Sequence, residues 1–147
     1  MNKNNLISFL DTLLRPYGFK KKGNNWTLDG DEISKLVNLQ KSYYGNLYYV
    51  NYGFIIKDLE LTTTTHVEMR LGSADKEQQK RITDLLNLEI DIESNQRLDE
   101  LKKVLITKVI VQLQSINSKI DLLDELKKRP HLNDIPLIVK DYFNLGL

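Results

Sequence analysis

The sequence predicts an α+β domain: a four-stranded antiparallel sheet packed on one face by an N-terminal helix and by long C-terminal helices. Residues 33–71 alternate between apolar and polar side chains and are rich in tyrosine, a pattern typical of strands. Short links separate the strand-like runs, which favours hairpins over crossover connections. Residues 98–123 instead repeat apolar side chains every three or four positions, which indicates helix.

Length and composition are those of one folded domain, which we place at residues 1–147. Of the 147 residues, 41% are hydrophobic and 28% are charged, which is enough apolar material to bury a core. The net charge is only +1, from 21 basic and 20 acidic residues, whereas dedicated nucleic-acid-binding proteins usually carry a clear basic excess. Nucleic acid is therefore disfavoured as a partner.

The absence of cysteine excludes disulfide bonds, thiolate metal ligands and a cysteine nucleophile. No stretch has the ~20 consecutive apolar residues of a membrane-spanning helix, and the first residues lack an apolar segment of signal-peptide length. We therefore expect a cytoplasmic protein that does not enter a membrane.

The first predicted element is an amphipathic helix over residues 5–15. Its apolar side chains recur at helical spacing and form one face, and Pro16 and Gly18 end it. The residues of this apolar face are Leu6, Phe9, Leu10, Leu13 and Leu14.

Four strands are predicted next. The first is short and leads into or out of a turn at Gly23, in the segment from Lys20 to Leu28. A tight turn over residues 29–31 leads into the second strand, residues 33–42, because Asp-Gly between two strand-like runs is a hairpin signal. The third strand covers residues 47–57 and the fourth residues 64–71.

Alternation along these strands assigns their side chains to two faces of the sheet. On the third strand Val50, Tyr52 and Phe54 share an apolar face, which we expect to pack on the helices. The opposite face is polar, and its predicted members are Asn38, Gln40, Tyr49, Asn51, His66, Glu68 and Arg70.

The second half of the chain is predicted to be helical. A helix covers residues 75–88, with Ser73 able to cap it. The apolar stripe that begins at Leu98 and runs through Ile120 to Leu123 implies one long helix, or two helices separated by a break near residues 115–118. After Pro130, a last helix begins near Pro136, with Asp134 able to cap it.

Three alternating polar residues, His66, Glu68 and Arg70, are one candidate for chemistry. His66 could act as a base and Arg70 could bind a carboxylate or phosphate. The favoured interpretation is simpler: any half-exposed strand alternates in this way, and its charges form cross-strand pairs.

A second candidate is the run Lys20, Lys21 and Lys22 near Trp26, Tyr43 and Tyr44. Lysines interleaved with aromatic residues can follow a phosphate backbone and stack on bases, as in RNA-binding proteins. The competing interpretation is that the lysines protect a sheet edge from pairing with another chain, while the aromatic residues form cross-strand pairs.

No catalytic motif is present. The glycines do not have Walker or dinucleotide-binding spacing, and there is no serine nucleophile elbow. The two histidines, His66 and His131, have no carboxylate cluster beside them, so we expect no metal site and no cofactor. These absences favour a protein that is not an enzyme.

Two segments carry a resemblance to a known family. The residues from Gly18 to Trp26 read Gly-Phe-Lys-Lys-Lys-Gly-Asn-Asn-Trp, and a later strand contains Asn38-Leu39-Gln40-Lys41-Ser42. With a leading helix and the sequence Arg70-Leu71-Gly72, this arrangement resembles the bacterial family called domain of unknown function 4304. The resemblance covers residues 5–72 best, implies a fold without a mechanism, and suggests that Lys21, Gly23, Asn24, Asn38, Gln40 and Lys41 belong to one shared feature.

The first function hypothesis is a non-enzymatic binding protein that engages a protein partner through the polar sheet face and the lysine-rich edge. The alternatives are a small-ligand-binding domain or enzyme that uses the polar cluster, and a weak RNA-binding module. The candidate binding residues are Lys20, Lys21, Lys22, Trp26, Asn38, Gln40, Lys41, Tyr49, Asn51, His66, Glu68 and Arg70.

Overall fold

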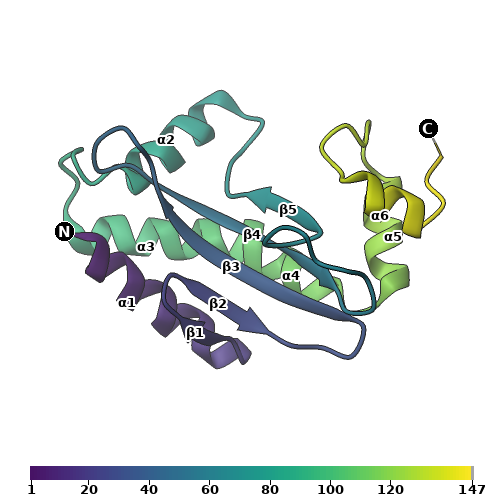
Figure 1. The fold of residues 1–147 in the computed structure, drawn as a ribbon. Helices are drawn as coiled ribbons and strands as arrows, with labels where there is room; N and C mark the ends of the chain where they lie inside the picture. The colour runs from purple at the N-terminus through teal and green to yellow at the C-terminus, as the bar shows by residue number, and fades with distance from the viewer. Residues whose placement is uncertain (147) are drawn as a thin grey trace.

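The computed structural model describes residues 1–146 and has an antiparallel sheet at its centre (Figure 1). The sheet has five strands in the order β1-β2-β3-β4-β5, so neighbours in sequence are neighbours in space. This is a meander of hairpins, as the short predicted links require. The strands are β1 (Lys20–Lys22), β2 (Asn25–Leu28), β3 (Ile33–Lys41), β4 (Tyr48–Ile56) and β5 (Val67–Arg70).

The sheet has one strand more than predicted, because the lysine run itself forms β1. Lys21 pairs with Trp26 across a tight turn at Gly23, whose φ of 63° suits glycine. The prediction of four strands was wrong at this point because all three residues of β1 are exposed. A strand without a buried residue shows no apolar alternation in its sequence.

Strands β3 and β4 form the longest hairpin of the sheet. Their pairing runs from Ile33 opposite Ile56 to Lys41 opposite Tyr48. Gly53 lies near the middle of β4, and a Cβ atom there would come within 2.3 Å of the carbonyl oxygen of Val67. β5 can therefore approach β4 closely only because residue 53 has no side chain.

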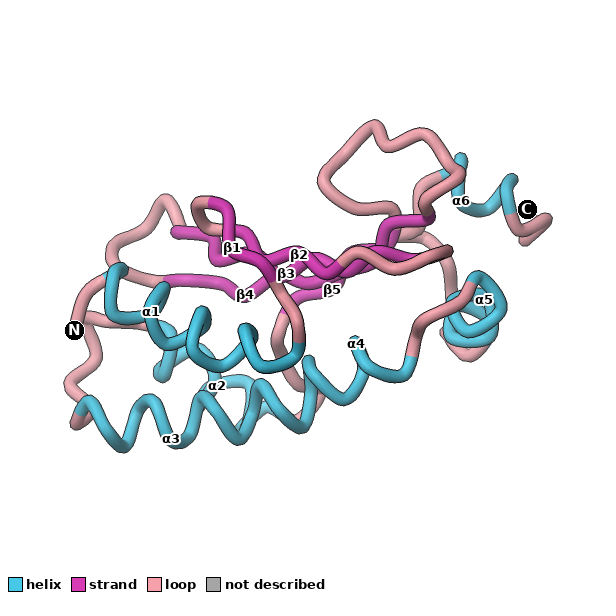
Figure 2. The backbone as a smooth tube through the Cα atoms, turned by 90° about the horizontal axis from the view of Figure 1, so that it is seen from below, coloured by secondary structure: helices cyan, strands magenta, loops and turns pink. Residues whose placement is uncertain are grey.

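Helices α1 to α4 are gathered on one side of the sheet, whereas α6 lies beyond the end of the strands (Figure 2). In Figure 2, α1, α2, α3 and α4 lie below the strands, and no helix crosses the opposite face. The core forms where this layer meets the sheet, and Leu10, Trp26, Val50, Phe54 and Leu101 are among its members, each with no more than 2% of its surface exposed. The helices are α1 (Lys3–Leu14), α2 (Lys76–Leu86), α3 (Ser94–Leu105), α4 (Val111–Ser115), α5 (Lys119–Lys127) and α6 (Leu137–Tyr142).

The apolar stripe of the second half does not form one continuous helix. It is broken between Ser115 and Lys119, as the predicted alternative of two helices places it. A single π-helical turn, Ile106–Ile110, joins α3 to α4, and the helix ends where Ile116 adopts extended φ and ψ angles of −118° and 104°. Ser118 then caps α5 by accepting a hydrogen bond from the backbone N–H of Asp121. The break changes which side chains face inward: Leu122 is buried, whereas Ile120, which the stripe predicted to be apolar core, is 70% exposed.

Two predicted caps differ in the structure. Asp75, not Ser73, caps α2, by accepting a hydrogen bond from the backbone N–H of Gln78 at 2.9 Å. The N-cap of α6 is Pro136, not Asp134.

Within residues 1–146, no helix is long and apolar enough to cross a membrane.

Candidate functional site: the polar sheet face

The face of the sheet that points away from the helix layer is polar. Side chains of residues paired directly across antiparallel strands lie on the same face, so the register assigns its members. We call it the polar face and define it by the strand residues Lys20, Lys22, Asn25, Thr27, Ser34, Leu36, Asn38, Gln40, Tyr49, Asn51, Ile55, Glu68 and Arg70.

Four of these residues form a row of hydrogen bonds that crosses four strands. Asn25, Asn38, Asn51 and Arg70 are direct register partners on β2, β3, β4 and β5. The Nε of Arg70 donates to Oδ1 of Asn51 at 2.9 Å, and Nδ2 of Asn51 donates to Oδ1 of Asn38 at 3.2 Å. Nδ2 of Asn38 in turn donates to Oδ1 of Asn25 at 2.8 Å. Each side chain of the row therefore donates to the next, from Arg70 towards Asn25, and the Oδ1 atom of each asparagine accepts one of these hydrogen bonds.

Gln40 closes the row into a network. Its Oε1 accepts from Nδ2 of Asn51 at 2.8 Å and from Nη2 of Arg70 at 3.1 Å. Asn51 is only 6% exposed, yet its three hydrogen bonds use both amide protons and the carbonyl oxygen. A buried amide whose bonds are all made stabilises the arrangement and fixes the rotamers of its neighbours.

The unused groups of this network are all donors. Within residues 1–146, Nδ2 of Asn25, Nε2 of Gln40 and Nη1 of Arg70 make no hydrogen bond. The formal charges of the face also favour a negative partner. Its strands carry three cations, Lys20, Lys22 and Arg70, and one carboxylate, Glu68, which gives the face a net charge of +2. The polar face is thus prepared to receive acceptors and negative charge.

Not all the predicted binding residues share this face. Lys21 and Lys41 have the opposite alternation, since their register partners are Trp26 and Tyr48. Nζ of Lys41 donates to the carbonyl oxygen of Gly45 at 3.0 Å, which ties it to the β3–β4 turn. Both lysines are exposed, but their alternation assigns them to the other side of the sheet, so they do not belong to the polar face.

Trp26 lies in the core and not on a binding surface. It has 0% of its surface exposed, and its Nε1 donates to Oδ1 of Asp11 on α1 at 3.2 Å. Its place on β2 gives it the alternation of Val37 and Tyr52, both of which face the helices. The indole therefore anchors α1 to the sheet.

The prediction that His66 lies on the polar face was wrong. The fourth strand begins only at Val67, and His66 turns inward, with 3% of its surface exposed. Its Nδ1 accepts from the backbone N–H of Ile56 at 2.8 Å, and its Nε2 lies 2.8 Å from the carbonyl oxygen of Glu60, to which it donates. Both ring nitrogens are therefore occupied in holding the loop between β4 and β5.

Asn25 is the member of the network that the sequence interpretation missed. Its position one residue before Trp26, a buried strand residue, was the available signal, because alternation then directs Asn25 to the polar side.

The β3–β4 turn carries two exposed aromatic side chains, Tyr43 and Tyr44, which are 100% and 85% exposed. The turn itself is held by a hydrogen bond from the N–H of Leu88 to the carbonyl oxygen of Asn46 at 2.9 Å.

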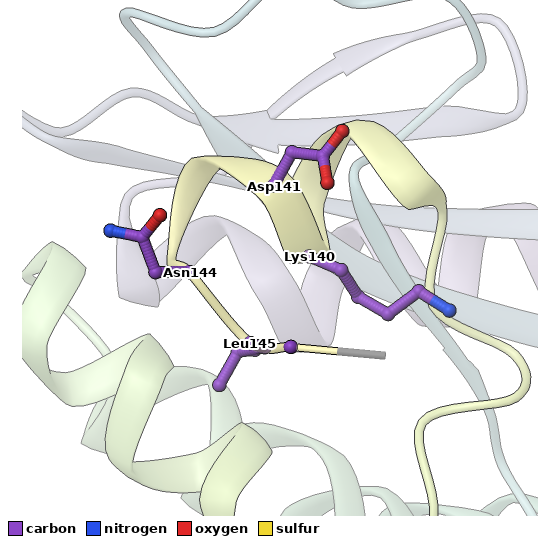
Figure 3. Close-up of a pocket in the computed structure, with 5 residues that line it drawn as sticks. Lys140, Asp141, Asn144 and Leu145 are labelled. Carbon is purple, nitrogen blue, oxygen red and sulfur yellow. The ribbon is translucent and has the colours of Figure 1, made fainter.

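Five cavities in the described part of the chain lie away from the network, and none is lined by Arg70, Gln40 or Asn51. One of about 360 Å³ is formed by α6 and the turn after it, with Lys140, Asp141, Asn144 and Leu145 around it (Figure 3). Another of about 430 Å³ lies between α1 and α3 and is lined largely by apolar side chains such as Phe9 and Leu98. The network therefore lies outside these five cavities, on a face whose strand residues range from buried, as Leu36 and Asn51 are, to exposed, as Arg70 is.

Other charged groups outside the polar face have structural partners. Arg97 is 2% exposed and donates through Nη1 to the carbonyl oxygens of Asp84, Leu85 and Asn87, near the C-terminus of α2. Asp58 accepts from the Tyr142 hydroxyl at 2.7 Å and from Nζ of Lys119 at 3.2 Å, and these hydrogen bonds hold the pKa of its carboxyl below the ordinary value. Among residues 1–146, no group of three or more His, Asp or Glu side chains could hold a metal ion.

An α+β fold with one helix layer and an open, donor-rich sheet face is the class of protein that these observations define. The family model described as "Domain of unknown function (DUF4304)" matches residues 10–118, which is most of the chain. The chain therefore belongs to the DUF4304 family, as the resemblance in its first half indicated. Comparisons with curated proteins and with solved structures gave no match.

Proposed function

We propose that this chain is a non-enzymatic binding protein that engages a protein partner through the polar face and the lysine-rich edge strand β1. The observation that carries the proposal is the hydrogen-bonded network of Asn25, Asn38, Asn51, Gln40 and Arg70 on a face that no helix covers. Side chains whose rotamers are already fixed lose little entropy when a partner binds, which favours their use in recognition.

An open surface suits a protein partner better than a small molecule. Small-ligand sites are usually concave and enclose most of the ligand, whereas none of the five cavities named above includes the network. An enzyme that used His66 as a base has little support, because both ring nitrogens are engaged with the backbone.

RNA is a weaker alternative for the same surface. Stacking of bases needs free aromatic faces, but Trp26 is buried and the guanidinium carbon of Arg70 lies 4.0 Å from the centre of the Tyr49 ring. Arg70 thus occupies one face of that ring. The exposed rings of Tyr43 and Tyr44 belong to the β3–β4 turn and not to the strands of the polar face. The net charge of +1 also gives the chain little long-range attraction for a phosphate backbone.

Co-purification from the native cell tests this proposal, with variants chosen to change one surface at a time. The reversal Lys20→Glu with Lys22→Glu changes the edge of the polar face, where both side chains are exposed. The matched control, Lys102→Glu with Lys103→Glu, reverses two exposed lysines on α3, in the helix layer. Circular dichroism and thermal unfolding check that each variant is folded.

The expected result is a partner protein that accompanies the wild-type chain and the α3 control but is lost from the β1 variant. If the same partner remains with the β1 variant, or if the wild-type chain is recovered alone, the proposal is wrong. A partner that nuclease treatment removes would instead favour the RNA alternative.

A further inference from the structure

Arg70 is held in one orientation by three neighbours, and this leaves one specific edge of its guanidinium free. Nε and Nη2 donate along one side, to Asn51 at 2.9 Å and to Gln40 at 3.1 Å. Tyr49 supports the plane of the group at 4.0 Å. The remaining edge, formed by Nη1 and the second proton of Nη2, has no partner within residues 1–146.

The free edge has the geometry of a bidentate donor. Two parallel N–H groups of a guanidinium match the two oxygens of a carboxylate, and such pairs are stronger and more directional than single hydrogen bonds. The unused Nε2 of Gln40 belongs to the same network and provides a third donor close by. A fixed guanidinium of this kind needs no rearrangement before it binds.

The surroundings favour a carboxylate over a phosphate group. Glu68 lies on the same strand and the same face as Arg70, and its negative charge opposes a dianionic phosphate more than a singly charged carboxylate. Lys20 and Lys22 stand at the opposite edge of the sheet, beyond β2, where they can meet further acidic residues of an extended partner surface. The arrangement fits a protein with several separated carboxylates.

We infer that the partner presents an acidic surface to the polar face, and that one Asp or Glu carboxylate of that surface binds the free guanidinium edge of Arg70. This inference rests on the proposed function, because it names the chemistry of the partner at the same face. Arg70 is the specificity-determining residue, Asn51 and Gln40 position it, and the lysines of β1 attract the remaining acids.

A hexaglutamate peptide is the probe for this site, with hexaglutamine as the neutral peptide of equal length and inorganic phosphate as the competing anion. Binding is measured by NMR titration of the isotope-labelled full chain, following the Nε–H signal of Arg70. The variant Arg70→Lys keeps the charge and removes the planar fork. Arg15→Lys is the matched control, because Arg15 is an exposed arginine directly after α1, on the helix side of the sheet, paired with Asp11.

Hexaglutamate is expected to shift the Arg70 signal at millimolar concentrations, and hexaglutamine is not. Arg70→Lys should weaken binding about tenfold, the loss that corresponds to about one charge-assisted hydrogen bond, whereas Arg15→Lys should not change it. The shift of the Arg70 signal is read on the wild-type chain, so it remains informative if Arg70→Lys does not fold.

Three results would overturn the inference: no shift with hexaglutamate, equal binding by Arg70→Lys, or tighter binding of phosphate than of the peptide. None of them contradicts the proposed function, which depends on the partner lost from the β1 variant. Conversely, a wild-type chain recovered alone contradicts the proposed function even if the peptide binds. The two failures are therefore distinguishable.

Discussion

Single residues in this protein show how burial changes the role of a polar side chain. His66 and Lys35 are both ionisable, and they are 3% and 6% exposed. Each is bonded to another part of the chain: His66, just before β5, to the backbone of Ile56, and Lys35 to Asn117 through a hydrogen bond of 2.7 Å from Nζ to Oδ1. Both side chains therefore have structural partners, and each gives a prediction at this scale.

Replacement of His66 should destabilise the fold. In His66→Ala the buried N–H of Ile56 loses its acceptor and the carbonyl oxygen of Glu60 loses its donor, so we expect the free energy of unfolding to fall by about 2–4 kcal/mol. His66→Asn keeps an acceptor at the position of Nδ1 and should cost less. Urea unfolding followed by Trp26 fluorescence measures both, and equal losses would contradict the assigned role of Nδ1.

Lys35 should make stability depend on pH in a direction set by its burial. Burial lowers the pKa of its ammonium group below 10.5, and the nearby Asp121 only partly opposes this. The cost of burying the charge is present at neutral pH and disappears as the pH rises through the folded pKa towards 10.5, because the amine then loses its proton in both states.

The variant Lys35→Met fills similar space without a charge. At neutral pH we expect it to match or exceed the wild-type free energy of unfolding, by about 0–2 kcal/mol, although the hydrogen bond to Asn117 is lost. The advantage should shrink as the pH is raised. Urea unfolding at several pH values tests this, and a variant less stable by more than about 1 kcal/mol at neutral pH would contradict it.

At the scale of elements, the β3–β4 hairpin joins a rigid base to an exposed tip. Strands β3 and β4 pair from Ile33 opposite Ile56 to Lys41 opposite Tyr48, and the N–H of Leu88 holds the far end of the turn. Tyr43 and Tyr44 protrude from this support. Exposed tyrosines on a fixed backbone are frequent anchors in protein interfaces, because they bury a large area at small entropic cost.

The double change Tyr43→Ser with Tyr44→Ser should leave stability within about 0.5 kcal/mol of the wild-type value, since neither ring is packed. We expect it to reduce capture of the partner protein, because the tip adjoins the strands of the polar face. Ile120→Ser, at another exposed apolar residue, is the control. Unfolding curves and quantitative co-purification give the two readouts; unchanged capture would remove the tip from the interface.

The whole molecule is nearly neutral, and this predicts how binding responds to salt. A face with three cations and one carboxylate on a chain of net charge +1 gives short-range attraction that ions screen only in part. Raising the salt from about 50 to about 200 mM should therefore weaken partner binding only several-fold. A loss of about 10³ or more would indicate many phosphate contacts and favour nucleic acid.

Much of the fold follows from local patterns in the sequence. Alternation found β3 and β4 and placed Asn38, Gln40, Asn51 and Arg70 on one side of the sheet, as the register confirms. The predicted break near residues 115–118 is present as well. Local patterns failed at two places. Strand β1 has no buried residue and therefore shows no apolar alternation, and His66 turns inward to bond the backbone of Ile56, a contact that its own neighbours in the sequence do not indicate.

By itself, the sequence determined the order of elements, the two faces of the central strands and the family to which the chain belongs, because these depend on periodicity and short motifs. Only the tertiary structure decided which polar residues meet. Asn25, Asn51 and Arg70 are far apart along the chain and become neighbours through strand pairing. Hydrogen bonds between such residues depend on the positions of atoms from different strands, which a local sequence pattern does not determine. In this network they leave one edge of the Arg70 guanidinium free.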